Sequence, residues 1–72
     1  MSQMKPVESS LINAVGYDHE NEELTIAFKT NGQKYLYKGV PASLYSGLLN
    51  AHSVGQYFLR NIKPHYSGVK QP

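Results

Sequence analysis

The pattern of apolar and polar residues predicts three β-strands in the first half of the chain. A largely apolar run, Leu11–Tyr17, ends at the polar segment 18–22, and Leu24–Phe28 then alternates with the period of two that is typical of a strand. Lys34–Lys38 follows the pair Asn31-Gly32. Asn-Gly between such stretches predicts a two-residue type I′ turn, whose two central residues both need a positive φ. The three strands therefore form an antiparallel meander.

After Pro41 the apolar period changes to that of a helix. The first predicted helix covers 42–49, although Gly47 weakens it by about 1 kcal/mol relative to alanine. Ser53 with Gln56 three residues later predicts a capping box that opens a second helix, and Pro64 ends it. The predicted fold class is α+β: a three-stranded antiparallel meander followed by two short helices packed on one face (β-β-β-α-α).

The two faces of the second helix differ in polarity. Its apolar face carries Val54, Tyr57, Phe58 and Ile62. Its polar face carries Gln56, Arg60 and Lys63.

A two-residue turn at Asn31-Gly32 also fixes which residues of the hairpin face each other. It places Lys29 opposite Lys34 and Phe28 opposite Tyr35. One face of the sheet then carries Leu24, Ile26, Phe28, Tyr35 and Tyr37. The Tyr-x-Tyr pair is either a platform for stacking bases or part of the core. We favour the core, because the helices need an apolar face to cover and this is the only large one.

The chain of 72 residues is expected to form a single domain. Its core covers about residues 7–66, residues 1–6 form a loose arm and residues 67–72 form a tail. The chain has no cysteine, no run resembling a signal peptide and no stretch of about 20 apolar residues. These features predict a cytoplasmic protein that is a monomer on its own.

Charge is distributed unevenly along the chain. All five acidic residues lie within the first 23 residues, which carry one lysine and a net charge of −4, while the other 49 residues carry six basic residues and a net charge of +6. Such asymmetry indicates either an anionic partner or an uneven solubilising surface. The opposed Lys29 and Lys34 have the same two explanations in local form: an anionic ligand, or protection of a strand edge against aggregation.

Catalytic and metal-binding patterns are weak. His19, His52 and His65 have no paired spacing that would place two imidazoles on one helix face, so no metal site is predicted. No Gly-x-Ser-x-Gly elbow surrounds Ser9-Ser10, and the glycines form no phosphate-binding loop. We expect no cofactor and no enzymatic activity.

Several short motifs, taken in order, resemble the KTSC domain, a family named after the C-terminus of some lysyl-tRNA synthetases. They are Ser9-Ser10-Leu11-Ile12, Val15-Gly16-Tyr17-Asp18, Tyr35-Leu36-Tyr37, Gly39-Val40-Pro41 and the segment 51–58 with its Ala-x-Ser-x-Gly pattern. The resemblance covers about residues 7–66. It implies a small bacterial or phage protein, and RNA binding has been proposed for the family, which supplies no catalytic residues.

The leading hypothesis is a non-enzymatic module that docks on nucleic-acid-processing machinery. Stand-alone chains of this kind also resemble phage regulators that bind host RNA polymerase, which makes a small transcription regulator the first choice. The expected nucleic-acid-binding residues are Lys29, Lys34, Lys38, Arg60 and Lys63. The expected protein-binding residues are Asp18, Glu20, Glu22 and Glu23. The alternatives are a domain that binds RNA or single-stranded DNA directly, and a protein adaptor without nucleic-acid contact.

Overall fold

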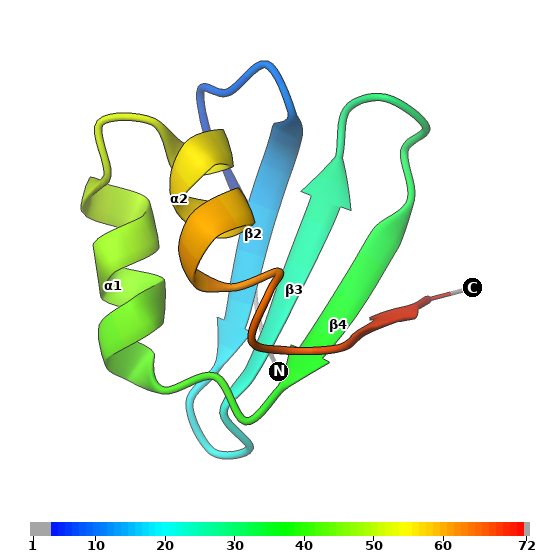
Figure 1. The fold of residues 1–72 in the computed structure, drawn as a ribbon. Coiled ribbons are helices and arrows are strands. Elements are labelled where there is room, and N and C mark those ends of the chain that lie inside the picture. Colours follow the sequence, from blue (N-terminus) through cyan, green and yellow to red (C-terminus); the bar gives the residue numbers. More distant parts are fainter. Residues whose placement is uncertain (1–3, 72) are drawn as a thin grey trace.

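The computed structural model describes residues 4–71 and shows one antiparallel sheet with both helices on one of its faces (Figure 1). Five strands lie side by side in chain order: β1 (Lys5–Pro6), β2 (Ile12–Asp18), β3 (Glu23–Phe28), β4 (Lys34–Lys38) and β5 (Gly68–Lys70). Helices α1 (Ala42–Asn50) and α2 (Val54–Asn61) connect β4 to β5.

The α+β class, the three long strands and both helices are confirmed, but the predicted three-stranded sheet is too small. The expected arm contains β1, which pairs with β2, and the expected tail contains β5, which pairs with β4. Residues 1–3 and 72 lie outside the described residues. Because β1 and β5 are two and three residues long, their sequences carry too few positions to show a strand period.

The β2–β3 turn is organised by Asp18. One carboxylate oxygen of Asp18 accepts the backbone N–H groups of Glu20 (3.0 Å) and Asn21 (3.3 Å), and the other accepts the side-chain amide of Asn21 (2.8 Å). Glu22 completes the turn in the left-handed region, with φ 52°. Its carbonyl accepts the backbone N–H of Val40 (3.0 Å), which ties the turn to the segment that leads into α1.

The predicted type I′ turn at Asn31-Gly32 is wrong. The backbone N–H of Phe28 donates to the carbonyl of Gln33 (2.9 Å), so the loop holds four residues and not two. Gly32 has φ 68°, whereas Asn31 does not have a positive φ. Instead, the Asn31 side-chain oxygen accepts the backbone N–H of Gln33 (3.0 Å), an Asx turn that competes with the type I′ geometry.

The longer loop shifts the hairpin register by two residues without exchanging the faces. Tyr35 lies opposite Ile26, and Tyr37 lies opposite Leu24. Because side chains alternate along a strand, an even shift keeps each one on its predicted side of the sheet. The assignment of the tyrosines to the core is confirmed for Tyr37, which is 5% exposed, and Tyr35 is half-buried beside Phe28.

The core lies between the sheet and the helices. It is built from Ile12, Val15, Tyr17, Leu24, Ile26, Tyr37, Val40, Leu48, Val54, Phe58 and Ile62. The hydroxyl of Tyr17 donates to the carbonyl of Val40, and its ring stacks on Tyr45 of α1 with centroids 4.8 Å apart. One strand residue therefore fixes both α1 and the segment before it.

The start of α2 confirms the predicted cap, because the Ser53 side chain accepts the backbone N–H of Gln56 (3.3 Å). The first turn of α2 also packs closely on the chain before β2. Ser9 accepts the backbone N–H groups of Leu11 (3.1 Å) and Ile12 (3.2 Å), and its oxygen would lie 3.1 Å from a Cβ placed on Gly55. Among residues 4–71, no helix is long and apolar enough to cross a membrane.

Candidate nucleic-acid interface

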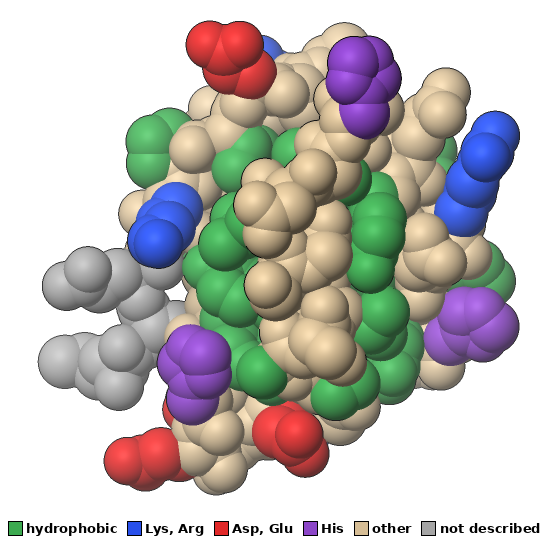
Figure 2. Space-filling model, turned by 90° about the vertical axis from the view of Figure 1, so that its left-hand side faces the viewer, with side chains coloured by type: hydrophobic (Ala, Val, Ile, Leu, Met, Phe, Trp, Pro, Cys, Tyr) green, Lys and Arg blue, Asp and Glu red, His purple; other side chains and the backbone are tan. Residues whose placement is uncertain are grey.

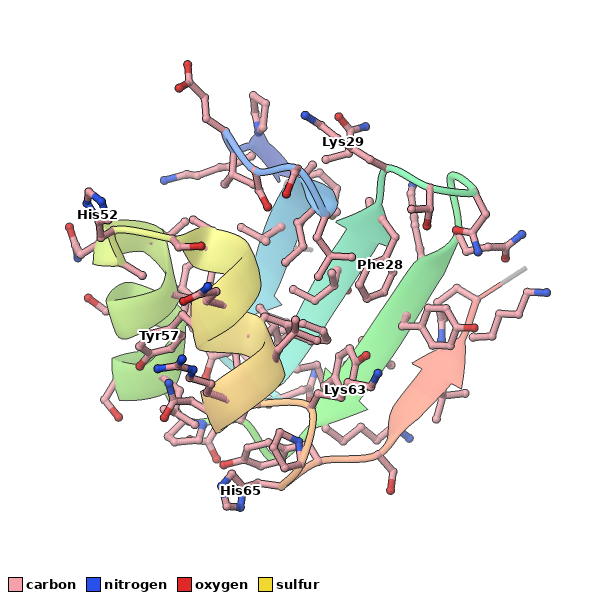
Figure 3. The ribbon with its side chains drawn as sticks, turned by 45° about the horizontal axis from the view of Figure 1, so that its top comes forward. Phe28, Lys29, His52, Tyr57, Lys63 and His65 are labelled. Carbon is pink, nitrogen blue, oxygen red and sulfur yellow. The ribbon has the colours of Figure 1, made fainter. Side chains whose placement is uncertain are left out.

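The five basic residues expected to bind nucleic acid do not form one surface. Lys34 and Lys38 lie on the face of the sheet away from the helices, whereas Arg60 belongs to α2 and Lys63 follows it. Lys29 lies in the β3–β4 loop, at the end of the sheet (Figure 3). The helical layer and the sheet separate the two groups, so a single ligand strand would not contact both by a short path (Figure 1).

The predicted pair of opposed lysines is absent from the hairpin. Lys34 lies opposite Ala27, and the backbone N–H of Lys29 donates to the carbonyl of Leu11 (2.9 Å). The cause is the four-residue loop, which removes Lys29 from the ladder. The two lysines therefore do not repel each other across the hairpin. Their predicted pairing no longer supports an anionic ligand.

Lys38 lies at the acidic end of the sheet. Its position is directly opposite Glu23, which is in turn opposite Asp18. Opposed residues of opposite charge attract each other across a strand pair. Lys38 and Lys34 are four residues apart, which is about 13 Å along a strand. The outer face of β4 is therefore not a continuous basic surface.

The four acids expected to bind a protein do lie together at the β2–β3 turn. Glu20 and Glu22 are exposed, and Asp18 and Glu23 are half-buried at the two strand ends. The hydrogen bond from the Asn21 side chain lowers the pKa of Asp18, and the bonds from the backbone of Asn21 and Glu20 act in the same direction. Asp18 thus serves the turn, while Glu20 and Glu22 remain open to a partner.

An open pocket with a volume of about 340 Å³ lies along α2 and the connection from α1. Its lining consists of Ala51, His52, Ser53, Gln56, Tyr57, Arg60 and Asn61. We call this the α2 pocket. None of the seven residues is acidic, so a bound anion meets no carboxylate in the lining.

The helical repeat explains how these side chains come together. Gln56 and Arg60 are four residues apart, as are Tyr57 and Asn61, and residues at that spacing are neighbours on a helix surface. The side-chain amide of Asn61 donates to the carbonyl of Tyr57 (3.3 Å). Arg60 lies in the last turn of α2, where its charge is favourable to the helix dipole.

Tyr57 contributes a ring to both the core and the pocket. It packs against the buried cluster and lies over Gly47 of α1, whose missing side chain leaves room for it. The sequence predicts Tyr57 only as a core residue, so this member of the pocket is missed. Its spacing to Asn61 is the one sequence signal for the second role.

Lys63 does not line the α2 pocket. It follows the C-cap of α2, and its backbone N–H donates to the carbonyl of Phe58 (2.9 Å). In Figure 3, Lys63 lies beside the sheet, whereas Tyr57 lies on the side of α2 that faces α1. The predicted grouping of Gln56, Arg60 and Lys63 therefore holds for the first two only.

Among residues 4–71, no group of three His, Asp or Glu side chains is arranged to hold a metal ion. His52 and His65 lie at opposite ends of the helical layer (Figure 3). His19 packs its ring against Tyr17, with centroids 4.8 Å apart. Each histidine thus has separate surroundings.

The side of the molecule formed by α1 offers no charge to an anionic ligand. Helix α1 contains no Asp, Glu, Lys or Arg. In the view onto this side, charged side chains lie at the rim, and the centre is a ridge without charged side chains, flanked by apolar ones (Figure 2). The α2 pocket, in contrast, combines a concave surface with a basic side chain.

The side chains of this pocket can bind a ligand through hydrogen bonds and aromatic stacking. The planar guanidinium of Arg60 suits two parallel hydrogen bonds to a phosphate. The amides of Gln56 and Asn61 both donate and accept, as base edges require. Tyr57 offers part of an aromatic ring, the group on which bases stack in single-strand-binding proteins.

Comparison with known proteins gives one consistent result. The family model described as KTSC domain matches residues 8–66. A protein of Tsukamurella paurometabola is 42% identical over 66 residues, which is 92% of this chain and 97% of that protein. An uncharacterised protein of Stutzerimonas stutzeri is 38% identical over 61 residues, 83% of this chain and 84% of its own length.

The fold itself also matches a solved structure. The crystal structure of a KTSC domain protein from Yersinia pestis superimposes with a TM-score of 0.95 at 36% identity, and the match covers 100% of both chains. The small edge strands β1 and β5 lie inside this full-length match.

Proposed function

The chain belongs to the KTSC domain family, and from that premise we propose that it is a non-enzymatic module that binds single-stranded nucleic acid, RNA above all, in the α2 pocket. The observation that carries the proposal is the lining of this pocket, where Arg60, Tyr57 and two side-chain amides meet without an acidic residue. A phosphate, a base edge and a base face each find a matching group there.

The distribution of charge also favours binding of an anionic strand at the α2 pocket. The acidic β2–β3 turn lies at one end of the sheet, and the α1–α2 connection that opens the pocket lies towards the other end (Figure 1). An anionic strand that approaches the pocket is therefore kept away from the most acidic part of the surface. This separation favours one orientation of a bound strand.

Direct binding measurements test the proposal. Fluorescence anisotropy with a labelled single-stranded RNA, a single-stranded DNA and an RNA duplex is expected to show binding of the single strands that weakens as salt rises. Replacing Tyr57 by phenylalanine keeps the ring and is expected to preserve binding. Replacing it by leucine removes the stacking surface and is expected to cost about 1–3 kcal/mol of binding free energy.

Two results would contradict the proposal. One is the absence of binding to either single strand at low salt by protein whose circular dichroism shows it to be folded. The other is equal affinity of Tyr57→Leu and the unmodified protein, which would place the ligand elsewhere.

The exposed acids of the β2–β3 turn favour a second role, docking on a protein with a basic surface. Glu20 and Glu22 are exposed on this turn, so a partner can reach both side chains. A nucleic-acid-processing complex is the partner class that fits both roles, and RNA polymerase is the member that the sequence resemblance names. Capture of a partner that is lost in Glu20→Gln/Glu22→Gln, and resists nuclease, tests this role separately from RNA binding.

A further inference from the structure

The face of the sheet opposite the helices is covered by no element among residues 4–71, and its centre is apolar. The register places two kinds of residue on this outer face: the uncharged Pro6, Ala14, Gly16, Thr25, Ala27, Leu36 and Val69, and the charged Lys34, Asp18, Glu23 and Lys38 around them. We call this set the outer face. A sheet face that remains in water is usually polar, whereas here the row of Gly16, Thr25 and Leu36 is uncharged, and the charged side chains lie around it. Val69 is 53% exposed, the largest exposed fraction among the large apolar side chains of residues 4–71.

From this face we propose that two copies of the chain associate through their sheets, outer face against outer face. The first argument is that the shapes of the side chains in the two copies fit each other. Gly16 on β2, Thr25 on β3 and Leu36 on β4 lie in one row across the sheet. A two-fold axis parallel to β3 places β2 of one copy over β4 of the other, so each Leu36 meets Gly16 of the second copy.

The second argument for this association is that opposite charges of the two copies face each other. The neighbouring row consists of Asp18 on β2, Glu23 on β3 and Lys38 on β4. The same axis places each Lys38 over Asp18 of the second copy, which makes two attractive contacts. The two Glu23 side chains meet at the axis, and each already faces Lys38 across its own strand pair. The axis perpendicular to the strands would instead place Lys38 over Lys34, which is repulsive.

The size of the face sets the strength of the association. Five strands spaced about 4.8 Å apart span about 20 Å, and five residues along a strand span about 17 Å. The area is therefore about half of the ~800 Å² per partner that a standard stable interface buries. The dimer is accordingly weak, forms between micromolar and millimolar protein, and leaves both α2 pockets on its outer surfaces.

Sedimentation equilibrium tests the dimer with the full chain over that concentration range. The mass is expected to rise from one chain to two. Leu36→Lys and Val69→Lys each place a charge in the interface and are expected to raise the dissociation constant more than about tenfold. The control is Leu59→Lys on α2, which changes an exposed leucine (45%) away from the sheet and is expected to dimerise unchanged.

A second measurement keeps the result independent of folding defects. In NMR spectra of the unmodified protein, the amide signals of Thr25, Leu36 and Val69 are expected to shift with protein concentration, and those of Gln56 and Arg60 to stay fixed. A mass of one chain up to millimolar protein would overturn the inference. Loss of the dimer in Leu59→Lys but not in Leu36→Lys would overturn it equally, because the interface would then lie on the helices.

Discussion

Gly68 on β5 lies directly opposite Tyr37 on β4, and the Tyr37 ring covers the glycine so closely that a Cβ there would lie 2.7 Å from two ring carbons. The ring also packs edge to face against Phe58 of α2, with centroids 5.4 Å apart. It is thus held between β5 and α2, and its buried position depends on the absence of a side chain at residue 68.

The first prediction is that Gly68→Ala destabilises the fold by about 1–3 kcal/mol, the usual cost of overpacking. Reduced freedom of the unfolded chain would by itself favour alanine by about 0.4–1 kcal/mol. A fall in the free energy of unfolding would therefore show that the new Cβ is crowded by Tyr37. Thermal unfolding followed by circular dichroism measures the change. Ser67→Ala is the control, and an equal or higher midpoint for Gly68→Ala would show that the ring moves aside freely.

The second prediction concerns Gly47 and Tyr57. A Cβ at Gly47 would overlap the Tyr57 hydroxyl and lie 2.9 Å from the ring carbon that bears it. We expect Gly47→Ala to destabilise the protein, although alanine is better than glycine in a helix by about 1 kcal/mol. In the Tyr57→Ala background the same change is expected to stabilise by about that amount. Urea unfolding of the four proteins gives the coupling, and the same sign in both backgrounds would refute the contact.

The third prediction uses the left-handed backbone of Glu22. This conformation costs a residue with a side chain about 1–2 kcal/mol, and glycine adopts it freely at a smaller entropic cost. Glu22→Gly is therefore expected to stabilise the protein by about 0.5–1 kcal/mol, and Glu22→Val to destabilise it, since a β-branched residue tolerates this region least. The midpoints of urea unfolding check both, and a midpoint for valine above that for glycine would contradict the turn geometry.

The fourth prediction is a loss of stability in alkali. Burial raises the pKa of Tyr17, Tyr37 and Tyr45, and the Glu22 and Asp18 carboxylates raise the pKa of Tyr17 further. In the unfolded chain tyrosine ionises near pH 10, to within about one unit. Above that pH the unfolded state loses protons that the folded state keeps, so the free energy of unfolding falls as pH rises and is unaffected below it.

Urea unfolding at a series of alkaline pH values measures this dependence. Tyr17→Phe removes one of the three groups and is expected to reduce the slope, after an initial loss of about 1 kcal/mol for the hydrogen bond to Val40. A free energy of unfolding that stays constant above the unfolded pKa would contradict the raised values.

The fifth prediction separates the two basic regions. Arg60→Gln in the α2 pocket is expected to weaken single-stranded RNA binding and to reduce the salt slope of log K by about 0.7, the value for one phosphate contact on a single strand. Lys38→Gln removes the same charge on the other side of the sheet and is expected to leave the slope unchanged. Equal effects of the two changes would mean that RNA responds to net charge and not to the pocket.

The order of the three long strands and two helices could be predicted because each shows a period over five or more residues. The hairpin register could not. Asn31-Gly32 fits a type I′ turn by residue type, but the backbone N–H of Gly32 donates to the carbonyl of Phe28 (3.1 Å), which closes a longer loop. Strand β5 depends on the cover that Tyr37 gives to Gly68, a tertiary contact that no local pattern contains.

The candidate site was predictable in part. Arg60 and Gln56 share a polar helix face by spacing alone, and the structure places both in the α2 pocket. The hairpin lysines depended on the wrong register, and their grouping was lost with it. The core role of Tyr57 was apparent from its apolar neighbours. Tyr57 reaches the pocket because Gly47 on α1 leaves room for its ring. The spacing of residues in the sequence does not reveal this contact between two helices.

Both borders of the sheet are made by the ends of the chain, since β1 and β5 are the outermost strands. Short terminal strands fray first, so amide hydrogen exchange should be fastest in these two strands and slower in β3. When β5 detaches, the hydrogen-bonding groups along β4 become available to any other extended chain. A truncation before Gly68 would make that opening permanent, and we expect it to increase aggregation.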